Sequence, residues 1–275
     1  MRNVNTFIGA PVERVEDLRF LRGRGQYVDD LVRPGQWHAA IVRSPVAHGR
    51  LRSVDTAAAL AMPGVNAVIT AQDVGRPIPA IPFRRPNPTI VPYAQPVLAD
   101  DVVRYVGEPV AVVLADSAER AEDAAQAVTL DIEHWPAVAD RHAAARAEPL
   151  LIAGTASNCA AVFAANAGDV DAAFRTAAYT RREQFRVQRM TAMTMETRGL
   201  LAEWDAAAGR LSVSGAAKLP FFNRRAMAAM MNLPEAAVDY VEYDVGGGFG
   251  ARGEFYPEDF LVAFAARTYG RPVKW

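Results

Sequence analysis

The sequence predicts an α/β protein, or more broadly an α+β one, because strand-like and helix-like segments alternate along it. β-rich runs and capped helical segments follow one another up to residue 138, and the pattern resumes at residue 168 after an alanine-rich stretch. A four-glycine turn then lies between a predicted strand and a predicted helix. We therefore predict an α/β domain over residues 1–138, a linker over 139–167 and a second domain over 168–275.

The first domain is predicted to hold five strands and two helices. A short helix after Asp55 is expected to stop at Pro63-Gly64, and Ser117 is expected to cap a second helix. The strands are expected over residues 36–43, 65–70, 102–106, 109–115 and 129–135. Residues 75–96 carry seven prolines, which predicts a long irregular loop. Loops of this length are usually functional or packed on a partner.

The second domain is predicted from residue 168 onward. Its expected helices cover residues 172–176, 223–231 and 257–269, and its expected hairpin pairs 200–205 with 210–214. Polar and apolar residues alternate between Tyr179 and Arg189, which predicts a long strand. Further strands are expected at 238–245 and 272–274. The last of these would leave an unpaired strand end unless another chain completes the sheet.

Composition and charge exclude two classes of partner. The 275 residues are 51% hydrophobic and 22% charged, and 30 basic residues balance 31 acidic ones to a net charge of -1. This balance lacks the basic footprint of a nucleic-acid binder. No apolar run reaches the roughly 18 residues of a membrane span, and the first residues lack the apolar core of a signal peptide. We therefore expect a cytoplasmic protein without nucleic-acid or membrane contacts.

Cys159 is the one cysteine of the chain. A single thiol cannot hold an iron–sulfur cluster, which needs about four ligands, so any electron relay would belong to another chain. Free cysteines are usually buried, and we expect the same of Cys159. The four histidines show no local zinc-binding spacing.

The run from Gly246 to Gly250 contains four glycines and is the strongest chemical signal. Glycines accept positive φ angles and let the backbone approach a ligand closely. Successive amides in such a loop can form a concavity that binds anions. The helix predicted from Pro257 begins with Glu258 and Asp259, which would repel an anion at its tip. The loop amides are therefore the expected contacts for a phosphate, pyrophosphate or oxo-anion.

Two other interpretations of the loop remain. It could be a turn that only lets a strand and a helix pack tightly. Residues 248–253 also spell G-x-G-x-x-G, the dinucleotide fingerprint. That fingerprint requires a second strand with an acidic end about 20 residues on, and the sequence ends at Trp275. A nicotinamide site is therefore disfavoured.

At this loop the sequence resembles the xanthine dehydrogenase/aldehyde oxidase-type molybdenum hydroxylases. The resemblance covers nearly the whole chain, and its segments follow the family's order. Those resembling the N-terminal hammerhead domain are GAPVER (9–14), GRGQYVDD (23–30), VRSPVAHGR (42–50) and RYVGEPVAVV (104–113). Those resembling the molybdopterin-binding domain are QRM (188–190), METRG (195–199), DVGGGFGAR (244–252) and FYPEDFL (255–261). The resemblance implies a hammerhead domain followed by an incomplete first molybdopterin-binding domain.

The resemblance implies oxidative hydroxylation of an aldehyde or N-heterocycle, with water as the oxygen source. It implies a molybdenum–molybdopterin cofactor, in the cytosine dinucleotide form, and electron transfer to 2Fe-2S clusters and FAD on partner subunits. The protein itself would bind and orient the cofactor, which carries the redox chemistry. The implied partners are an iron–sulfur subunit, an FAD subunit and a second molybdopterin-binding half or subunit.

The resemblance also assigns site residues one at a time. The implied cofactor-binding residues are Gly246, Gly247, Gly248, Phe249, Gly250, Ala251, Arg252 and Lys218. Lys218 stands where the family often has a glutamine near the metal's oxo group, so it either donates to the cofactor or is an exposed surface lysine. Glu196 and Arg198 are expected to form a structural ion pair. No residue is predicted to ligate the metal directly.

No residue of the chain matches the family's glutamate general base, so no catalytic residue is predicted. We expect this polypeptide to be inactive by itself and to be a split subunit, a truncation or a degenerate remnant. The alternative function is a non-catalytic binding or assembly module that kept the fold. The lysine at position 218 is the feature that favours this alternative.

Overall fold

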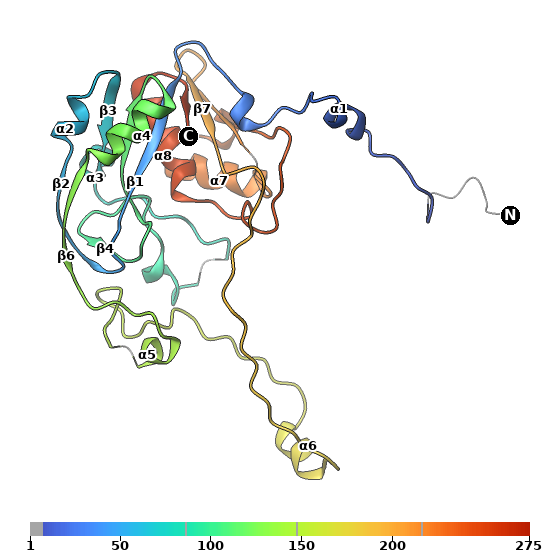
Figure 1. Cartoon of the computed structure of the whole chain (residues 1–275). Helices are drawn as coiled ribbons and strands as arrows, with labels where there is room; N and C mark the ends of the chain where they lie inside the picture. Colours follow the sequence, from blue (N-terminus) through green and yellow to red (C-terminus); the bar gives the residue numbers. More distant parts are fainter. Residues whose placement is uncertain (1–7, 86, 147, 216) are drawn as a thin grey trace.

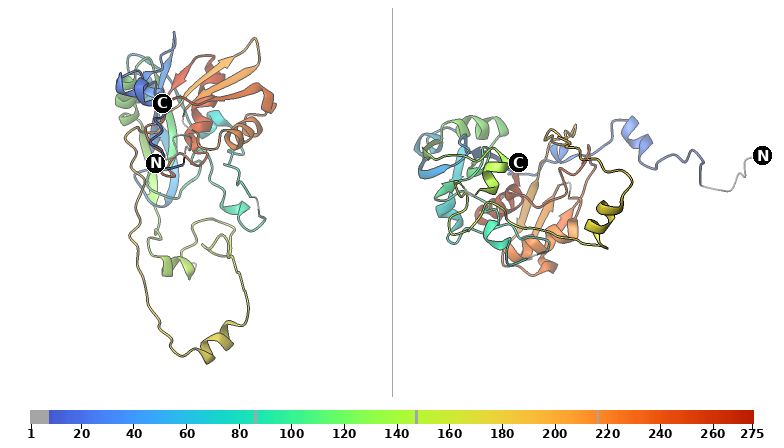
Figure 2. Two further views of the ribbon diagram at one scale, coloured as in Figure 1. Left: turned by 90° about the vertical axis from the view of Figure 1, so that its right-hand side faces the viewer. Right: turned by 90° about the horizontal axis from the view of Figure 1, so that it is seen from below.

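The computed structural model describes residues 8–85, 87–146, 148–215 and 217–275. Its body contains a seven-stranded sheet in the order β3-β5-β1-β10-β7-β8-β9 and a three-stranded sheet in the order β4-β2-β6. Two extensions leave this body: an N-terminal segment with α1 (Asp17–Leu21) and a long excursion with α6 (Val170–Thr176) at its far end (Figures 1 and 2). The mixture of strands and helices agrees with the predicted α+β class.

The N-terminal half is built around a strand that is buried along its whole length. β5 (Pro109–Ala115) lies between β3 (Val65–Ile69) and β1 (Trp37–Arg43), antiparallel to both. Its sequence PVAVVLA is a continuous apolar run because both of its faces are covered. α4 (Ala118–Gln126) packs on β1 and β5.

Several predicted elements of this half are confirmed. Ser117 caps α4, since its side chain accepts the Arg120 N–H at 3.3 Å. The remaining strands form the smaller sheet: β2 (Gly49–Asp55), β4 (Val102–Val103) and β6 (Thr129–His134). We did not predict β2, because its charged residues obscure the alternation of polar and apolar side chains that is typical of a strand. The short helices are α2 (Ala57–Leu60), α3 (Ala71–Val74) and α5 (Arg141–Ala145).

The C-terminal half contributes the other strands of the large sheet. The predicted hairpin is present as β7 (Leu201–Asp205) and β8 (Arg210–Ser214), and β9 (Val238–Val241) runs parallel to β8. α8 (Pro257–Tyr269) is buried along most of its length and packs on β7, while α7 (Pro220–Met230) contacts β9. α8 matches its predicted bounds, with Pro257 in the first turn and Gly270 at φ +59° as its C-cap.

The strand end predicted to be unpaired is in fact paired on both sides. β10 (Val273–Lys274) is parallel to β1 and antiparallel to β7. It thereby joins the N-terminal and C-terminal halves in one sheet. The Lys274 ammonium, which is almost buried, donates to the carbonyl oxygens of Asp29 and Leu31 at 2.5 and 3.2 Å.

Two further predictions are wrong. Residues 179–189 form no strand, because among the described residues no neighbouring strand pairs with them. Cys159 is exposed rather than buried, because it lies on the excursion after α5, away from the sheets. Two other predicted strands are shorter than expected: the one over 102–106 is only Val102–Val103, and the one over 238–245 ends at Val241.

The proline-rich loop of residues 75–96 packs on the body. Ile78 and Ile81 are partly buried against the main core. Arg84 reaches further, donating to the Gly253 carbonyl oxygen at 2.7 Å and to the Glu254 carboxylate. The proline-rich loop therefore contacts residues 253 and 254, which lie shortly after the four-glycine run. None of the helices within the described ranges combines the length and the hydropathy that a membrane span requires.

Replacing Leu114 by alanine tests the packing of β5. The Leu114 side chain is fully buried in the main hydrophobic core, so its truncation should cost about 2–5 kcal/mol of unfolding free energy. Leu21→Ala is the matched control, since that side chain is 86% exposed and its loss should cost within about 0.5 kcal/mol. Urea unfolding measures both variants. Equal destabilisation by the two changes would contradict this packing.

Candidate functional site

The glycine loop connects β9 to α8 at the edge of the C-terminal half (Figure 1). Gly247 and Gly250 adopt φ angles of +111° and +97°, which glycine accepts without a steric penalty. Phe249 also has a positive φ, +44°, a conformation that costs a residue with a Cβ about 1–3 kcal/mol. Its ring is 80% exposed. The loop thus holds an aromatic side chain out from the surface in a strained conformation.

A carboxylate from a distant segment fixes the start of this loop. Oε2 of Glu196 accepts the Gly246 amide at 2.7 Å and the Arg252 guanidinium at 2.8 Å. The Glu196 amide in turn donates to the Gly246 carbonyl oxygen at 3.2 Å. A Cβ on residue 246 would lie 2.4 Å from the Glu196 Cβ, so this position requires glycine. Glu196 therefore clamps both ends of the loop to one segment.

Arg252 makes its hydrogen bonds to this clamp through one Nη atom, while its buried Nε has no partner among the described residues. Its side chain is 4% exposed, and one Nη atom also donates to the carbonyl oxygens of Glu196 and Thr197 at 2.8 and 3.1 Å. The expected ion pair between Glu196 and Arg198 is wrong, because Glu196 pairs with Arg252 instead. The ion pair that Glu196 does form, with Arg252, is structural as expected, but its two residues lie 56 apart in the chain.

The amides in the middle of the loop remain free. Within the described ranges, the backbone N–H groups of Gly247, Gly248, Phe249 and Gly250 donate no hydrogen bond. Two tight turns follow, with Ala251 N–H donating to Gly248 and Gly253 N–H donating to Gly250, at 2.8 and 3.0 Å. A Cβ on Gly248 would meet no atom within 4 Å, so open space lies beside that residue. A loop with unpaired amides and open space beside it can receive an anionic ligand.

Lys218 is both exposed and next to the loop. Its amide donates to the Arg252 carbonyl oxygen at 3.2 Å, which places the residue against the loop's C-terminal end. Its side chain lines a hollow of about 420 Å³, together with Glu242, Val245, Gly248, Phe249, Gly250 and Arg252. We expected Lys218 either to donate to the cofactor or to be an exposed surface lysine. Lys218 is exposed and also lies on the wall of this hollow, so the two alternatives do not exclude each other.

A second hollow lies on another side of the loop. It measures about 620 Å³ and is lined by Phe249, Gly250, Ala251, Tyr256, Trp275 and the segment from Met190 to Arg198. Phe249 and Gly250 line both hollows, so the loop separates them. Thr197 and Arg198 of the METRG segment thus line this hollow, while Glu196 of the same segment forms the clamp.

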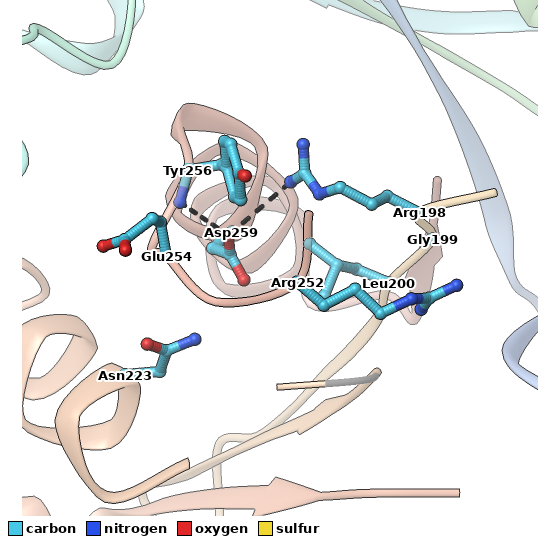
Figure 3. Close-up of a pocket in the computed structure, with 8 residues that line it drawn as sticks. All are labelled: Arg198, Gly199, Leu200, Asn223, Arg252, Glu254, Tyr256 and Asp259. Atoms are coloured by element: carbon cyan, nitrogen blue, oxygen red, sulfur yellow. Dashed lines mark hydrogen bonds and ion pairs between the residues drawn. The ribbon is translucent and has the colours of Figure 1, made fainter. Parts of the chain in front are cut away.

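Behind the loop, charged side chains gather at the start of α8 (Figure 3). The buried carboxylate of Glu258 accepts Arg43 of β1 at 2.7 Å and Arg198 at 3.4 Å. The Arg198 guanidinium also lies 3.6 Å from the Tyr256 ring centroid and 3.8 Å from Asp259. These contacts tie α8 to the first strand and to the METRG segment. Sequence reasoning missed Arg43 and Tyr256, although their motifs were noted.

Burial governs the protonation of Asp259. Burial raises the pKa of this carboxyl to about 6, against an ordinary value of 3.8, while the Tyr256 N–H and Arg198 oppose the shift. Asp259 accepts that N–H at 2.8 Å and so caps the first turn of α8. At the other end of the loop, the hydrogen-bonded Arg19 guanidinium holds the pKa of Asp244 below its usual range.

Glu196→Gln tests the clamp. The amide can still accept the Gly246 N–H, but the buried Arg252 charge loses its counter-charge, which should cost about 3 kcal/mol of unfolding free energy. Glu183→Gln removes the acid of the exposed pair with Arg181 and should cost less than about 1 kcal/mol. Urea unfolding compares the two. If Glu196→Gln lowers the unfolding free energy no more than Glu183→Gln does, the buried charge of Arg252 does not need Glu196 as its counter-charge.

The raised pKa of Asp259 predicts a pH-dependent difference between the wild type and Asp259→Asn. In the folded state the carboxyl binds its proton more tightly, so wild-type stability falls as pH rises from about 4 to about 6. The asparagine avoids this cost, and its advantage should grow from near zero at pH 4 to roughly 3 kcal/mol at pH 7. Denaturant midpoints across this pH range measure it. A difference that does not change with pH would contradict the burial effect.

Two family models match the chain. Residues 22–136 match the aldehyde oxidase and xanthine dehydrogenase a/b hammerhead domain, and residues 153–275 match the molybdopterin cofactor-binding domain. The second match contains the glycine loop, Lys218 and the Glu196 clamp. Together the two matches cover most of the chain.

Curated proteins and solved structures agree with these matches. The nicotine 6-hydroxylase large subunit of Paenarthrobacter nicotinovorans is 37% identical over 274 residues, which are 100% of this chain and 33% of the relative. The 6-hydroxypseudooxynicotine dehydrogenase complex subunit gamma of the same organism is 37% identical, over 99% of this chain and 35% of its own length. Quinoline 2-oxidoreductase from Pseudomonas putida 86 superposes with a TM-score of 0.86 at 38% identity, covering 96% of this chain and 34% of that one.

The chain thus spans about a third of the length of these relatives. Its two halves carry the family's two domain types in the expected order, and its fold superposes on a solved member. The chain belongs to the xanthine dehydrogenase/aldehyde oxidase-type family of molybdenum hydroxylases, as a portion of the molybdopterin-binding large subunit.

Proposed function

We propose that this chain is the part of a molybdenum hydroxylase that holds one side of the molybdopterin cofactor in a reaction that hydroxylates an aldehyde or an N-heterocycle. The observation that carries the proposal is the row of four amides from Gly247 to Gly250, which have no partner among the described residues and of which the last three belong to residues lining a hollow of about 420 Å³. The bound cofactor would supply the redox chemistry, taking electrons from a substrate C–H bond while water provides the oxygen.

The residues of the loop fit an anionic cofactor. Four N–H donors, unpaired within the described ranges, offer the hydrogen bonds that phosphate or oxo oxygens accept, and Lys218 adds a positive charge to a wall that also holds Glu242. Gly246 and Arg252 were expected to bind the cofactor as well, but Glu196 already occupies the Gly246 amide and an Arg252 Nη group. We assign these two residues to positioning the loop, and Gly247–Gly250, Ala251 and Lys218 to the cofactor.

The same proposal extends to the form of the cofactor, the partner subunits and the domain boundaries. The cofactor is the cytosine dinucleotide form, and a second molybdopterin-binding half or subunit completes its site and supplies the general base. Iron–sulfur and FAD subunits accept the electrons, in a cytoplasmic complex. The domain boundaries are 1–138, 139–167 and 168–275, and the chain by itself is inactive. A relative named as a subunit of a dehydrogenase complex supports this assembly.

A second candidate function is a non-catalytic module that kept the fold. The observation that favours it is Lys218, exposed at the position where the family often has a glutamine. A lysine carries a charge that an amide lacks, so it changes the environment of any oxo group placed in the hollow. Cofactor content separates the two functions.

The test is to co-express the chain with the two-thirds of the nicotine 6-hydroxylase large subunit that it does not match, and to measure molybdenum and released pterin in the purified complex. We expect both to be present. Gly248→Ala places a methyl group where no atom lies within 4 Å, so the fold should keep its urea midpoint. The methyl group crowds the amides, and pterin content should fall at least tenfold.

Two results would count against the catalytic assignment. A complex that contains neither molybdenum nor pterin would favour the non-catalytic module. Unchanged pterin content in Gly248→Ala, with unchanged stability, would show that the cofactor does not approach this loop. Lys218→Gln serves as the matched variant, because it restores the family's amide and should retain the pterin.

A further inference from the structure

The backbone that leads into the glycine run is held by a segment of the N-terminal half. β9 ends at Val241, and residues 242–245 connect it to Gly246. Within the described ranges, the one backbone hydrogen bond of this connection runs from the Asp244 N–H to the Gln26 carbonyl oxygen, at 2.9 Å. Gln26 lies 218 positions earlier in the sequence. The start of the glycine loop therefore depends on a contact with a distant part of the chain.

The same segment binds the side chain of Asp244. The carboxylate accepts the Gln26 N–H at 2.7 Å, and the Arg19 guanidinium donates to both of its oxygens, with 2.5 Å between Nη2 and Oδ1. Two-pronged pairing of this kind is stronger and more directional than a single hydrogen bond. The Asp244 side chain is 13% exposed, and its oxygens already accept three donors. Such a carboxylate fixes the backbone that carries it and is not a ligand for an anionic cofactor.

We name residues 19–26 the N-terminal strap. The strap begins within α1, which lies off the body of the molecule (Figure 1). It is a turn that forms its own contacts: the Arg24 N–H donates to the Arg19 carbonyl oxygen at 3.0 Å, and the Arg19 guanidinium lies 4.8 Å from the centroid of the Phe20 ring. Arg19 is therefore held by its own turn where it meets Asp244.

The chain that follows the strap is anchored on the body. Val28 and Leu31 are 3% and 4% exposed, so both side chains belong to the buried core. Lys274 of β10 donates to the carbonyl oxygens of Asp29 and Leu31. Since β10 joins the two halves of the large sheet, the strap connects that sheet to the start of the glycine loop.

We propose that Asp244 is a positioning residue of the glycine loop, and that the N-terminal strap holds it in place through Arg19 and Gln26. The Glu196 clamp fixes the start of the glycine run, and the strap fixes the backbone two residues before it. With both contacts formed, the amides of Gly247–Gly250 are presented in one arrangement, so less conformational entropy is lost when a ligand binds. This proposal rests on the proposed function, in which those amides receive the cofactor.

Amide hydrogen exchange in the purified full chain measures the order of the loop without any cofactor. Peptides that span residues 242–253 contain hydrogen-bonded amides, among them those of Asp244 and Gly246. Arg19→Gln and Asp244→Asn should each speed this exchange by about fivefold or more, because each removes the ion pair between strap and loop. The double variant Arg19→Gln/Asp244→Asn should exchange within about twofold of the faster single variant, since both changes break one contact.

Two further variants serve as controls. Arg19→Lys keeps the positive charge but loses the two-pronged geometry, so its exchange should fall between those of the wild type and Arg19→Gln. Asp116→Asn breaks an exposed ion pair with Arg120 of α4 and should exchange within about 1.5-fold of the wild type. The urea midpoints of the strap variants should stay close to that of Asp116→Asn.

Cofactor retention shows whether the order of the loop serves ligand binding. The sample is the complex of the full chain with the two-thirds of the nicotine 6-hydroxylase large subunit that it does not match. After dialysis, Arg19→Gln should retain about threefold less pterin than the wild type, at an unchanged urea midpoint. Arg19 lines neither hollow beside the loop as the structure describes them, so a direct contact with the cofactor does not explain such a loss.

The strap is refuted if neither single variant speeds the exchange, or if Asp244→Asn does so while Arg19→Gln does not. It is also refuted if both variants exchange faster but retain pterin like the wild type. Should Arg19→Gln lower the urea midpoint more than Asp116→Asn does, the milder Arg19→Lys decides. Faster exchange in Arg19→Lys at an unchanged midpoint supports the strap, and wild-type exchange overturns it.

The two measurements separate this proposal from the proposed function. A wild-type complex without pterin overturns the function, and exchange in the chain alone still decides the strap. A wild-type complex that contains pterin, with full retention in Arg19→Gln, overturns the strap and leaves the function intact.

Discussion

Two residue pairs, Trp37 with Val273 and His38 with Lys274, join the two halves of the chain into one sheet. On its other side β10 pairs with β7, on which α8 packs, so the strand fixes where α8 lies relative to the N-terminal half. The ion pair from Arg43 of β1 to the buried Glu258 of α8 reinforces the same relation. The glycine loop leads into α8, so the N-terminal half, which fixes α8, also helps to orient the loop. It does so without supplying hydrogen-bond partners to the loop amides within the described ranges.

The Glu196 clamp decides which loop groups are left for a ligand. The Glu196 carboxylate accepts the Gly246 amide and one Nη group of Arg252 and neutralises the arginine's charge, while Glu196 Oε1 and Arg252 Nε have no partner among the described residues. The amides from Gly247 to Gly250 have no partner among the described residues, and Gly247 and Gly250 hold this stretch of backbone at positive φ. Lys218 then contributes a positive charge to the hollow, with Glu242 on the same wall. The loop is thus rigid where it meets the body and open where a ligand could enter.

Local signals made much of the fold predictable. Pro257, the acidic first turn and Gly270 define α8 from the sequence, and the uninterrupted apolar run at 109–115 defines a strand covered on both faces. Pairings between distant segments could not be predicted in this way. Glu196 was assigned to its neighbour Arg198, since nothing local indicates that a carboxylate will choose an arginine 56 residues away. β10 was thought to be unpaired for the same reason, because its neighbours β1 and β7 lie far from it in the sequence.

The wrong prediction for residues 179–189 has a different cause. The alternation of side chains there is interrupted, since Arg181 and Glu183 occupy odd positions between Tyr179 and Phe185. A strand also needs a neighbour to accept its backbone hydrogen bonds, and a side-chain pattern carries no information on whether such a neighbour exists. Among the described residues no strand pairs with residues 179–189, and none of their side chains is buried. Backbone pairing with the body resumes at Glu196, whose amide donates to the Gly246 carbonyl oxygen, so the segment is tied to the sheets at the glycine loop rather than along its length.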